Sequence, residues 1–390
     1  EIAGSFRRSL ETVKDIDFVI SSTDPEAVTK IFITHYSVKE VIQHGKTKSA
    51  IRLKSGLQVD LRIVSEEEFP YTLHHFTGSK EHNVGLRARA IERGCKINEY
   101  GLYKNDERIR CGGESDFFAA LGLQYIPPEL REGRGEIEAA SDNMIPKLIN
   151  VKDIVGMLHM HSNYSDGVDS IIDLSKAVKK RGFSYMGITD HSQTATYAGG
   201  LSFDRVKRQW EEIDKLNETM APFKILKGIE SDILSDGSLD YTDKELEKFD
   251  FIVASIHSQF NMDREKMTER IVRAIKHPST CIIGHLTGRL LLERPGYELN
   301  LEKIFEQAAL NNVSIEINAH PSRLDLDWRH VKLARENGVM ISVNTDAHHQ
   351  SGLDHIRHGI GIARKGWLQR NDVLNTLDAD SFLKFANISK

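Results

Sequence analysis

The chain has 390 residues, three cysteines and a formal net charge of −5. The length allows two or three domains, and the negative charge argues against a protein that coats nucleic acid non-specifically. The sequence has no uninterrupted apolar run of roughly 18 residues, which excludes a transmembrane helix, and no C-x-x-C pair, so we expect a reducing, cytoplasmic setting. The 17 histidines are the unusual feature, because neutral imidazole is a common ligand of transition metals.

The first part of the chain, residues 1–70, is predicted to be β-rich with short helices. Residues 17–21 form an apolar strand, and residues 49–65 read as two alternating strands around the turn Lys-Ser-Gly. The composition changes after residue 77. Helices are predicted at 83–94, which ends in the C-cap glycine Gly94, and at 114–123, followed by a Pro- and Gly-containing ordered loop over 125–140.

From about residue 151, apolar strands alternate regularly with amphipathic stretches. The strands are 157–161, 185–189, 224–230, 251–257, 281–285, 314–318 and 340–346. The helices between them include 171–182, 203–220, 301–312 and 328–338. This alternation predicts a parallel α/β sheet closed into a barrel. A doubly wound sheet is the alternative, but no Gly-rich turn follows the first strand.

Side chains that can bind metal stand where each of these strands ends. They are His159, His161, Asp166, Asp190, His191, Glu230, His257, His285, Asn318, Asp346 and His348. Barrel strands bring their carboxyl ends to one face, and residues i and i+2 project to the same side. Such a set exceeds the needs of one ion and predicts two or three ions of Zn, Mn or Fe. Most other histidines are expected at the surface: His35, His44, His74, His277, His330, His355 and His358. The pattern leaves His320 and His349 open.

The motifs HMHSNYSDG, GITDHS, GIESDI, ASIHS, GHLTGR and VNTDAHH resemble those of the PHP (polymerase and histidinol phosphatase) family over about 151–390. The resemblance implies a distorted (β/α)7 barrel with a trinuclear metal site. Its ligands would be His159, His161, Asp166, His191, Glu230, His257, His285, Asp346 and His348. Asp190 would orient the His191 ring. Asn318, His320 and Arg323 are candidates for binding a substrate phosphate.

The N-terminal segment GSFRRSLETVKDID carries a second motif. Asp15 and Asp17 alternate on one strand and Asp60 lies in another, an arrangement that holds two Mg²⁺ or Mn²⁺ ions for phosphoryl transfer. With Gly4 and Ser5 as a phosphate-approach turn, the segment resembles the nucleotidyltransferase palm of family-X DNA polymerases. Residues 71–135 are similar to that family's thumb. The resemblance implies nucleotide or DNA contacts at Arg7, Arg8, His75, Phe76, Gly78, Asn83 and Arg87.

A truncated palm (1–70), a thumb (71–135), a linker (136–150) and a PHP barrel (151–390) together resemble the bacterial family-X DNA polymerases. The resemblance implies a repair polymerase whose barrel removes nucleotides from DNA 3′ ends. We expect gapped or 3′-ended DNA and dNTPs as partners, a monomer, no membrane, and an impaired polymerase half, because the sequence starts inside the palm. The alternatives are a small-molecule phosphatase of the histidinol phosphatase type and an inactive structural barrel.

Overall fold

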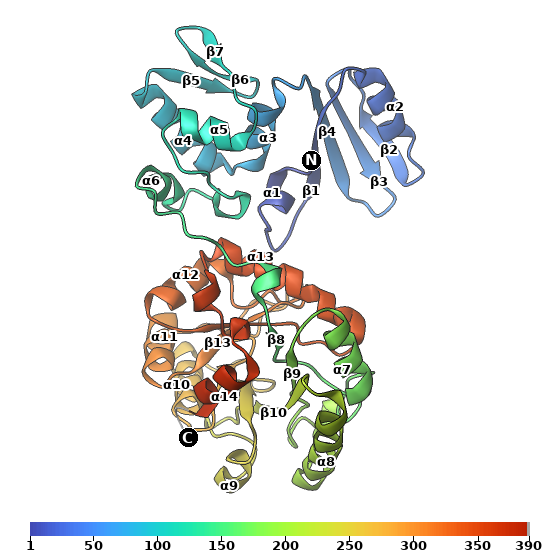
Figure 1. The fold of residues 1–390 in the computed structure, drawn as a ribbon, viewed down its shortest axis with the longest axis vertical. Coiled ribbons are helices and arrows are strands. Elements are labelled where there is room, and N and C mark those ends of the chain that lie inside the picture. Colours follow the sequence, from blue (N-terminus) through green and yellow to red (C-terminus); the bar gives the residue numbers. More distant parts are fainter. Residues whose placement is uncertain (388–390) are drawn as a thin grey trace. The chain divides into compact units, whose positions relative to one another are not determined.

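The computed structural model describes residues 1–387 and separates into two compact units, Glu1–Lys147 and the part from Leu148 onward. Each unit has its own sheet and core (Figure 1). Among the described residues, no helix is long and apolar enough to cross a membrane. The three cysteines are free thiols.

The N-terminal unit begins with a four-stranded sheet in the order β1-β4-β3-β2. The short helix α1 (Gly4–Arg7) precedes β1 (Asp15–Ser21), and helix α2 (Pro25–Thr34) follows it. The strands β2 (Val38–Gln43), β3 (Lys48–Leu53) and β4 (Gln58–Val64) complete the sheet. Strand β1 pairs with β4 in parallel, and this register sets Asp17 beside Asp60.

The rest of this unit is mostly helical. It contains α3 (Phe69–Thr77), α4 (Lys80–Glu92), α5 (Glu114–Ala120), α6 (Glu136–Ser141) and a small antiparallel sheet of β5 (Cys95–Asn98), β6 (Gly101–Lys104) and β7 (Glu107–Ile109). Helix α4 starts earlier than predicted, because the Ser79 side chain caps it by accepting a bond from the His82 N–H. The expected loop over 125–140 is partly wrong. It ends in α6, whose Glu136 carboxylate accepts bonds from the N–H groups of Gly133 and Arg134.

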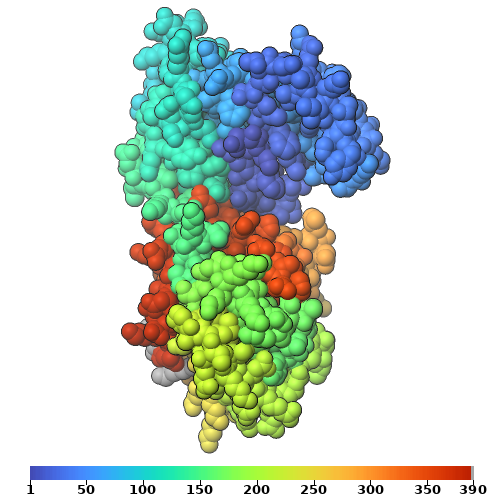
Figure 2. Space-filling model, turned by 45° about the vertical axis from the view of Figure 1, so that its right-hand side comes forward, coloured from blue at the N-terminus to red at the C-terminus, as the bar shows by residue number. Residues whose placement is uncertain are grey.

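The second unit is a seven-stranded parallel sheet in the order β14-β13-β12-β11-β10-β9-β8. Its strands are β8 (Gly156–Met157), β9 (Tyr185–Ile188), β10 (Lys224–Asp232), β11 (Phe251–Ser255), β12 (Ile282–Ile283), β13 (Ser314–Asn318) and β14 (Ile341–Asn344). Helices α7 (Ile171–Lys180), α8 (Phe203–Met220), α9 (Asp243–Leu246), α10 (Arg264–Ile275), α11 (Leu301–Leu310), α12 (Trp328–Glu336) and α13 (Ile356–Lys365) surround it. Helices α7 and α8 form part of the outer surface in Figure 2.

The sheet closes into a barrel beyond the ends of its first and last strands. Met160 and Ala347 form a parallel bridge, the His161 N–H donates to the Ala347 carbonyl, and the Asp346 N–H donates to the His159 carbonyl. The first strand is therefore split: Gly156–Met157 pairs with β9, and the following residues pair with the end of β14. Closure thus occurs at residues that the sequence marks as ligands.

Helix α14 (Ala379–Asn387) packs against the opposite end of the barrel, where the strands begin. Its Phe382 lies with its ring centroid 5.2 Å from that of Phe251 and 6.0 Å from that of Tyr185. Both partners are the first residues of their strands. Burying these three rings fills one end of the barrel and leaves the polar side chains at the other.

Candidate metal centre and palm carboxylates

Glu230, at the end of β10, lies at the middle of the polar end of the barrel. Its two carboxylate oxygens lie 3.1 to 3.5 Å from ring nitrogens of five histidines on four other strand ends: His159, His161, His191, His257 and His285. All six residues are buried or nearly so. With both of its oxygens among imidazole nitrogens, Glu230 could hold metal ions together with the surrounding histidines.

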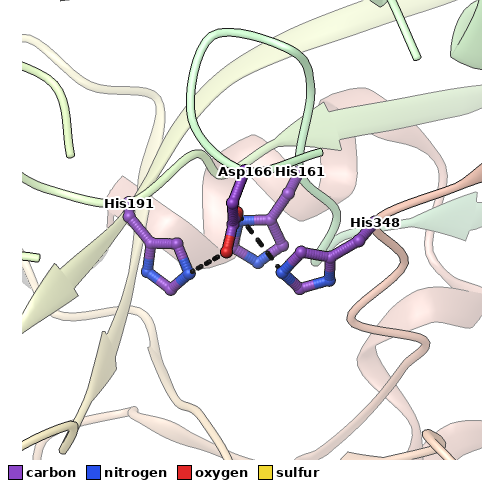
Figure 3. Close-up of side chains that lie close together, drawn as sticks. All are labelled: His161, Asp166, His191 and His348. Carbon is purple, nitrogen blue, oxygen red and sulfur yellow. Dashed lines mark ion pairs between the residues drawn. The ribbon is translucent and has the colours of Figure 1, made fainter. Parts of the chain in front are cut away.

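Asp166 lies close to His161, His191 and His348 at the rim of the barrel, and these four side chains form a second group of potential ligands (Figure 3). Asp166 lies on the loop after the first strand, and its oxygens are 3.6 Å from Nε2 of His191 and 3.4 Å from Nε2 of His348. His161 and His348 stack with ring centroids 4.2 Å apart. The four side chains offer ligand atoms that all lie within 4.8 Å of one another, which is close enough to hold one ion.

Asp346 holds the third group, at the end of β14. Its Oδ1 lies 3.1 Å from Nε2 of His161 and 3.6 Å from Nε2 of His159. Asp346 adopts φ of 51° and His285 adopts φ of 24°, both in the left-handed region that L-residues rarely occupy. Strain of this kind concentrates where a side chain must be aimed into a site.

Two further buried carboxylates each bind the second ring nitrogen of one predicted ligand histidine. Glu316 on β13 binds Nδ1 of His159 at 2.7 Å, and Asp232 binds Nδ1 of His257 at 2.7 Å. Neither residue was predicted from the sequence. A usable signal existed for Glu316, because it stands two residues before Asn318 on the same strand and must face the same side.

The donor set fits divalent transition metals. Glu316 binds Nδ1 of His159 and leaves the Nε2 atom of this ring buried without a hydrogen-bond partner. The Nδ1 atoms of His161 and His285 are also buried without a hydrogen-bond partner. Buried polar atoms are rarely left unsatisfied unless an ion or water completes them. Mixed imidazole and carboxylate donors suit Zn, Mn or Fe.

The carboxylates also govern the protonation of the rings. Burial disfavours the charged form of His257, but Glu230 and Asp232 outweigh it and raise its pKa to about 10. Desolvation disfavours the charged form of His348 as well, but hydrogen bonding to Asp166 and the charges of Asp346 and Asp166 together outweigh it and raise the pKa to about 9. Without cations these rings are held as imidazolium, so each ion that binds through them must displace a proton.

Asp190 has a different role from the one expected. Its buried carboxylate accepts bonds from the N–H and Oγ of Ser162, at 2.8 and 2.6 Å, and from the amide of Gln209 at 2.6 Å. It also binds Ser165. The prediction that it orients the His191 ring is therefore wrong. Asp190 anchors the loop that carries Asp166, because carboxylate oxygens so occupied fix the backbone around them.

The three residues proposed to bind phosphate lie near Asp346. The Asn318 amide donates to Asp346 Oδ2 at 3.0 Å and is fully buried. Arg323 brings its Nε to 3.7 Å from the same oxygen while its side chain is 21% exposed. His320 is half-buried and lies beside His355, with ring centroids 5.3 Å apart. Of the three, Arg323 combines a charge with access from solvent.

One of the histidines expected at the surface is not there. His74 is buried in the N-terminal unit between Phe117 and Phe118, and burial holds its pKa well below the usual value. His82, which the sequence analysis did not single out, is also buried and pairs with Glu136 at 2.6 Å. Both belong to the core of this unit. His349 is exposed and binds Ser351.

The palm carboxylates share one face of the N-terminal sheet. Asp15 and Asp17 alternate on β1, and Asp60 is the register partner of Asp17 on β4. Burial, then the charges of Asp15 and Asp60, raise the pKa of Asp17 to about 6. Clustered carboxylates that repel one another in this way form a favourable place for divalent cations.

Gly4 lies against these carboxylates. It adopts φ of 65°, and a Cβ at this position would stand 2.2 Å from Oδ2 of Asp17. Only glycine fits here, which explains the first residue of the Gly4-Ser5 turn. The two arginines that follow are occupied. Arg7 makes a two-pronged ion pair with Glu114, and Arg8 pairs with Glu132 at 3.0 Å.

The predicted thumb contacts lie around the junction of α3 and α4. The Arg62 guanidinium is 4.8 Å from the centroid of the Phe76 ring, and His75 is 3.9 Å from Glu99. The Asn83 amide donates to the carbonyls of His75 and Gly78, at 2.8 and 3.2 Å, and so caps α3. Arg87 is exposed on α4.

Comparisons with known proteins agree with this division. Residues 72–132 match the family model of the DNA polymerase beta thumb, and residues 157–320 match that of the PHP domain. The chain is 44% identical to the DNA polymerase/3′-5′ exonuclease PolX of Bacillus subtilis (strain 168), over 98% of the chain and 68% of that protein. The chain belongs to the PolX family. This PolX chain therefore has the thumb and PHP domains that the sequence motifs indicated.

Two further relatives each match only part of the PolX chain. A probable phosphatase of Thermoanaerobacter sp. (strain X514) is 28% identical over 56% of the chain and 89% of that relative. The repair DNA polymerase X of African swine fever virus is 28% identical over 33% of the chain and 78% of that relative.

Proposed function

We propose that the barrel hydrolyses the terminal phosphodiester of DNA 3′ ends and that the N-terminal unit adds nucleotides, so that the protein processes and fills gaps in DNA. The observation that carries the proposal is the convergence of nine potential ligands on one barrel end, with buried ring nitrogens lacking partners. The relative from Bacillus subtilis, named for both activities, supports it.

The barrel ligands would hold two or three ions of Mn or Zn through the Glu230, Asp166 and Asp346 groups. Bound ions of this kind lower the pKa of water and stabilise charge on phosphoryl oxygens. The chain's own residues supply the arrangement. Glu316 and Asp232 fix the orientations of the His159 and His257 rings, and the partly exposed Arg323 guanidinium would bind a non-bridging phosphate oxygen. The oxygen of water would add to phosphorus, and the bond from phosphorus to the 3′ oxygen of the preceding nucleotide would break. A proton from the water would end on that oxygen as the new 3′ hydroxyl, and a nucleoside 5′-monophosphate would be released.

In the N-terminal unit, Asp15, Asp17 and Asp60 would hold two Mg²⁺ or Mn²⁺ ions for transfer of a nucleotide from a dNTP. Their common face on β1 and β4 supports this role. The triphosphate contacts at Arg7 and Arg8 would require exchange of their present partners Glu114 and Glu132. Contacts at His75, Phe76 and Arg87 would serve the nucleotide and the template, and the working form would be a monomer.

A small-molecule phosphatase is the second candidate, because a relative that matches 56% of the chain is named a probable phosphatase. One experiment separates the two. Purified protein, analysed for Mn, Zn and Fe, is given 3′-recessed and gapped DNA labelled at the 5′ end, and in parallel phosphate monoesters such as p-nitrophenyl phosphate. The proposal expects stepwise shortening of the DNA from the 3′ end. Release of phosphate from the monoester alone would favour the phosphatase.

A further inference from the structure

Tyr197 is an aromatic side chain at the mouth of the barrel that the mechanism above does not use. It is 69% exposed and lies on a single 3-10 turn, Thr196–Ala198, after the second strand. Its ring centroid is 6.0 Å from that of His191 and 6.2 Å from that of His257. Those rings belong to two different strand ends, so Tyr197 stands over the ligand cluster with much of its surface open to solvent.

The turn that carries Tyr197 is rigidly held. Its neighbours Ala195 and Ala198 are buried, at 0% and 3% exposure, and the Leu201 N–H donates to the His191 carbonyl at 2.8 Å. A Cβ on Gly200 would meet the Ser192 carbonyl oxygen at 2.0 Å, so the backbone passes at a distance that only glycine allows. Arg205 donates to the Gly199 carbonyl at 2.8 Å. An exposed aromatic ring on a fixed backbone loses little entropy when a ligand packs on it.

The surroundings restrict what such a ring can bind. The adjoining side chains of the mouth are imidazoles and carboxylates, and the Arg323 guanidinium lies beside Asp346, near enough for its charge to act on the Tyr197 phenol. A phosphate held between the cluster and Arg323 would leave the attached nucleoside within reach of Tyr197. Bases of every sequence stack on aromatic faces.

We propose that Tyr197 is a base-stacking platform that positions the 3′-terminal nucleotide and makes the barrel select nucleotide diesters over simple phosphate esters. This inference rests on the proposed hydrolysis of DNA ends. It assigns Tyr197 to substrate positioning and gives its phenol oxygen no part in the reaction.

The test compares two diesters with the same leaving group, p-nitrophenyl thymidine 5′-monophosphate and methyl p-nitrophenyl phosphate. Only the first carries a base. In the metal-loaded full chain, Tyr197→Ala should lower kcat/KM for the thymidine diester about 10- to 100-fold, mainly through KM, and leave the methyl diester close to wild type. Tyr197→Phe should keep wild-type values for both. Tyr36→Ala, at an 81% exposed tyrosine of the N-terminal unit, is the matched control.

Three results would overturn the inference. Equal losses on both diesters, or loss of bound metal in Tyr197→Ala, would make Tyr197 a structural support. A Tyr197→Phe variant as deficient as Tyr197→Ala would assign the role to the hydroxyl. Wild-type protein that cleaves neither diester nor DNA would refute the proposed function itself, a result visible before any variant is compared.

Discussion

Glu230 illustrates how a single buried residue organises the barrel site. Burial alone would raise its pKa, but the surrounding imidazoles, His159 first, hold it well below the usual value. The surrounding imidazoles thus favour the ionised carboxylate, and both of its oxygens lie near ring nitrogens. Replacement of any residue around it changes the charge balance of the whole group.

Asp346 provides the sharpest test at this scale. Asp346→Ala removes an oxygen that lies 3.1 Å from His161 and 3.6 Å from His159. We expect loss of bound metal and a fall in 3′-end hydrolysis on the order of 10³-fold or more, because the ions supply both nucleophile and charge stabilisation. Metal analysis and a gel assay measure the two effects. Asp17→Ala is the control and should keep nearly full hydrolysis. If Asp17→Ala abolished hydrolysis and Asp346→Ala did not, the hydrolytic site would lie in the N-terminal unit and not in the barrel.

Glu316 is expected to orient the predicted ligand His159 and not to bind metal itself, and a substitution can test this role. Glu316→Gln keeps the shape but weakens the acceptor that binds Nδ1 of His159 and the His285 N–H. We expect metal affinity to fall about 10- to 100-fold, as for other residues that orient metal-binding histidines. Competition with a chelator during metal titration gives the affinity. The same change at the exposed Glu306 on α11 should have no effect, and an unchanged affinity in Glu316→Gln would refute the role.

At the scale of elements, parallel strand pairing explains both sites. Strands β1 and β4 run in the same direction and in a register that sets Asp17 beside Asp60. The barrel strands likewise bring their carboxyl ends to one face. Backbone pairing does not depend on side-chain charge. On β1 and β4 it brings like charges together, and bound cations would neutralise them, whereas in the barrel it brings carboxylates beside imidazoles.

The palm sheet should reveal this repulsion as a pH dependence. The pKa of Asp17 is about 6 in the folded state against 3.8 unfolded. The unfolded state therefore loses its proton first, and the free energy of unfolding falls as pH rises from about 4 to about 6 and stays reduced above that. Asp17→Asn removes the penalty. In metal-free buffer at pH 8 it should stabilise the N-terminal unit by about 1 to 2 kcal/mol, less than the full shift because the carboxyl is partly solvated.

Denaturant unfolding at pH 8 and near pH 4 measures this difference. Most of the gain should disappear at the lower pH, where Asp17 is protonated in the folded state and only about half ionised in the unfolded state. Asp106→Asn, at an exposed turn between β6 and β7, is the matched control and should be neutral at both values. A stabilisation that persists at pH 4 would show that packing rather than charge is responsible.

At the scale of the whole molecule, the chain consists of two compact units, each with its own cluster of acidic residues on parallel strands. The barrel cluster combines imidazole with carboxylate, whereas the palm cluster has carboxylates alone. Imidazole favours transition metals, and carboxylates alone suit magnesium. The two sites should therefore respond to different ions.

This difference predicts the response of each unit to metal removal. After chelation, addition of Mn²⁺ or Zn²⁺ at about 100 times its dissociation constant should stabilise the barrel by about 2.7 kcal/mol and raise its melting temperature by roughly 5 to 10 °C. Differential scanning calorimetry measures the shift. Asp346→Ala should abolish it. If Asp17→Ala and not Asp346→Ala abolished the metal-induced rise in melting temperature, the transition-metal site would lie in the N-terminal unit.

The sequence by itself determined the kind of fold and the family. Alternating apolar strands and helices predicted the barrel, and strand-end residues predicted the ligand set, because both follow from short-range periodicity and from the direction that parallel strands impose. The paired palm carboxylates were predictable for the same reason. The family comparisons confirm the PolX family, the thumb and the PHP domain, and the roles of the palm carboxylates and of the individual barrel ligands stay predictions.

Only the tertiary structure decided which polar residues support which. Asp190 precedes His191 in sequence, yet it binds Ser162 and Gln209, while Glu316 reaches His159 across 157 positions. His74 has no distinguishing sequence context and is buried between aromatic rings. Hydrogen-bond partners depend on where remote strands and loops meet after the barrel closes. A local sequence pattern contains no information on these long-range contacts. The hydrogen-bond partners of the predicted ligands could therefore be identified only in the folded chain.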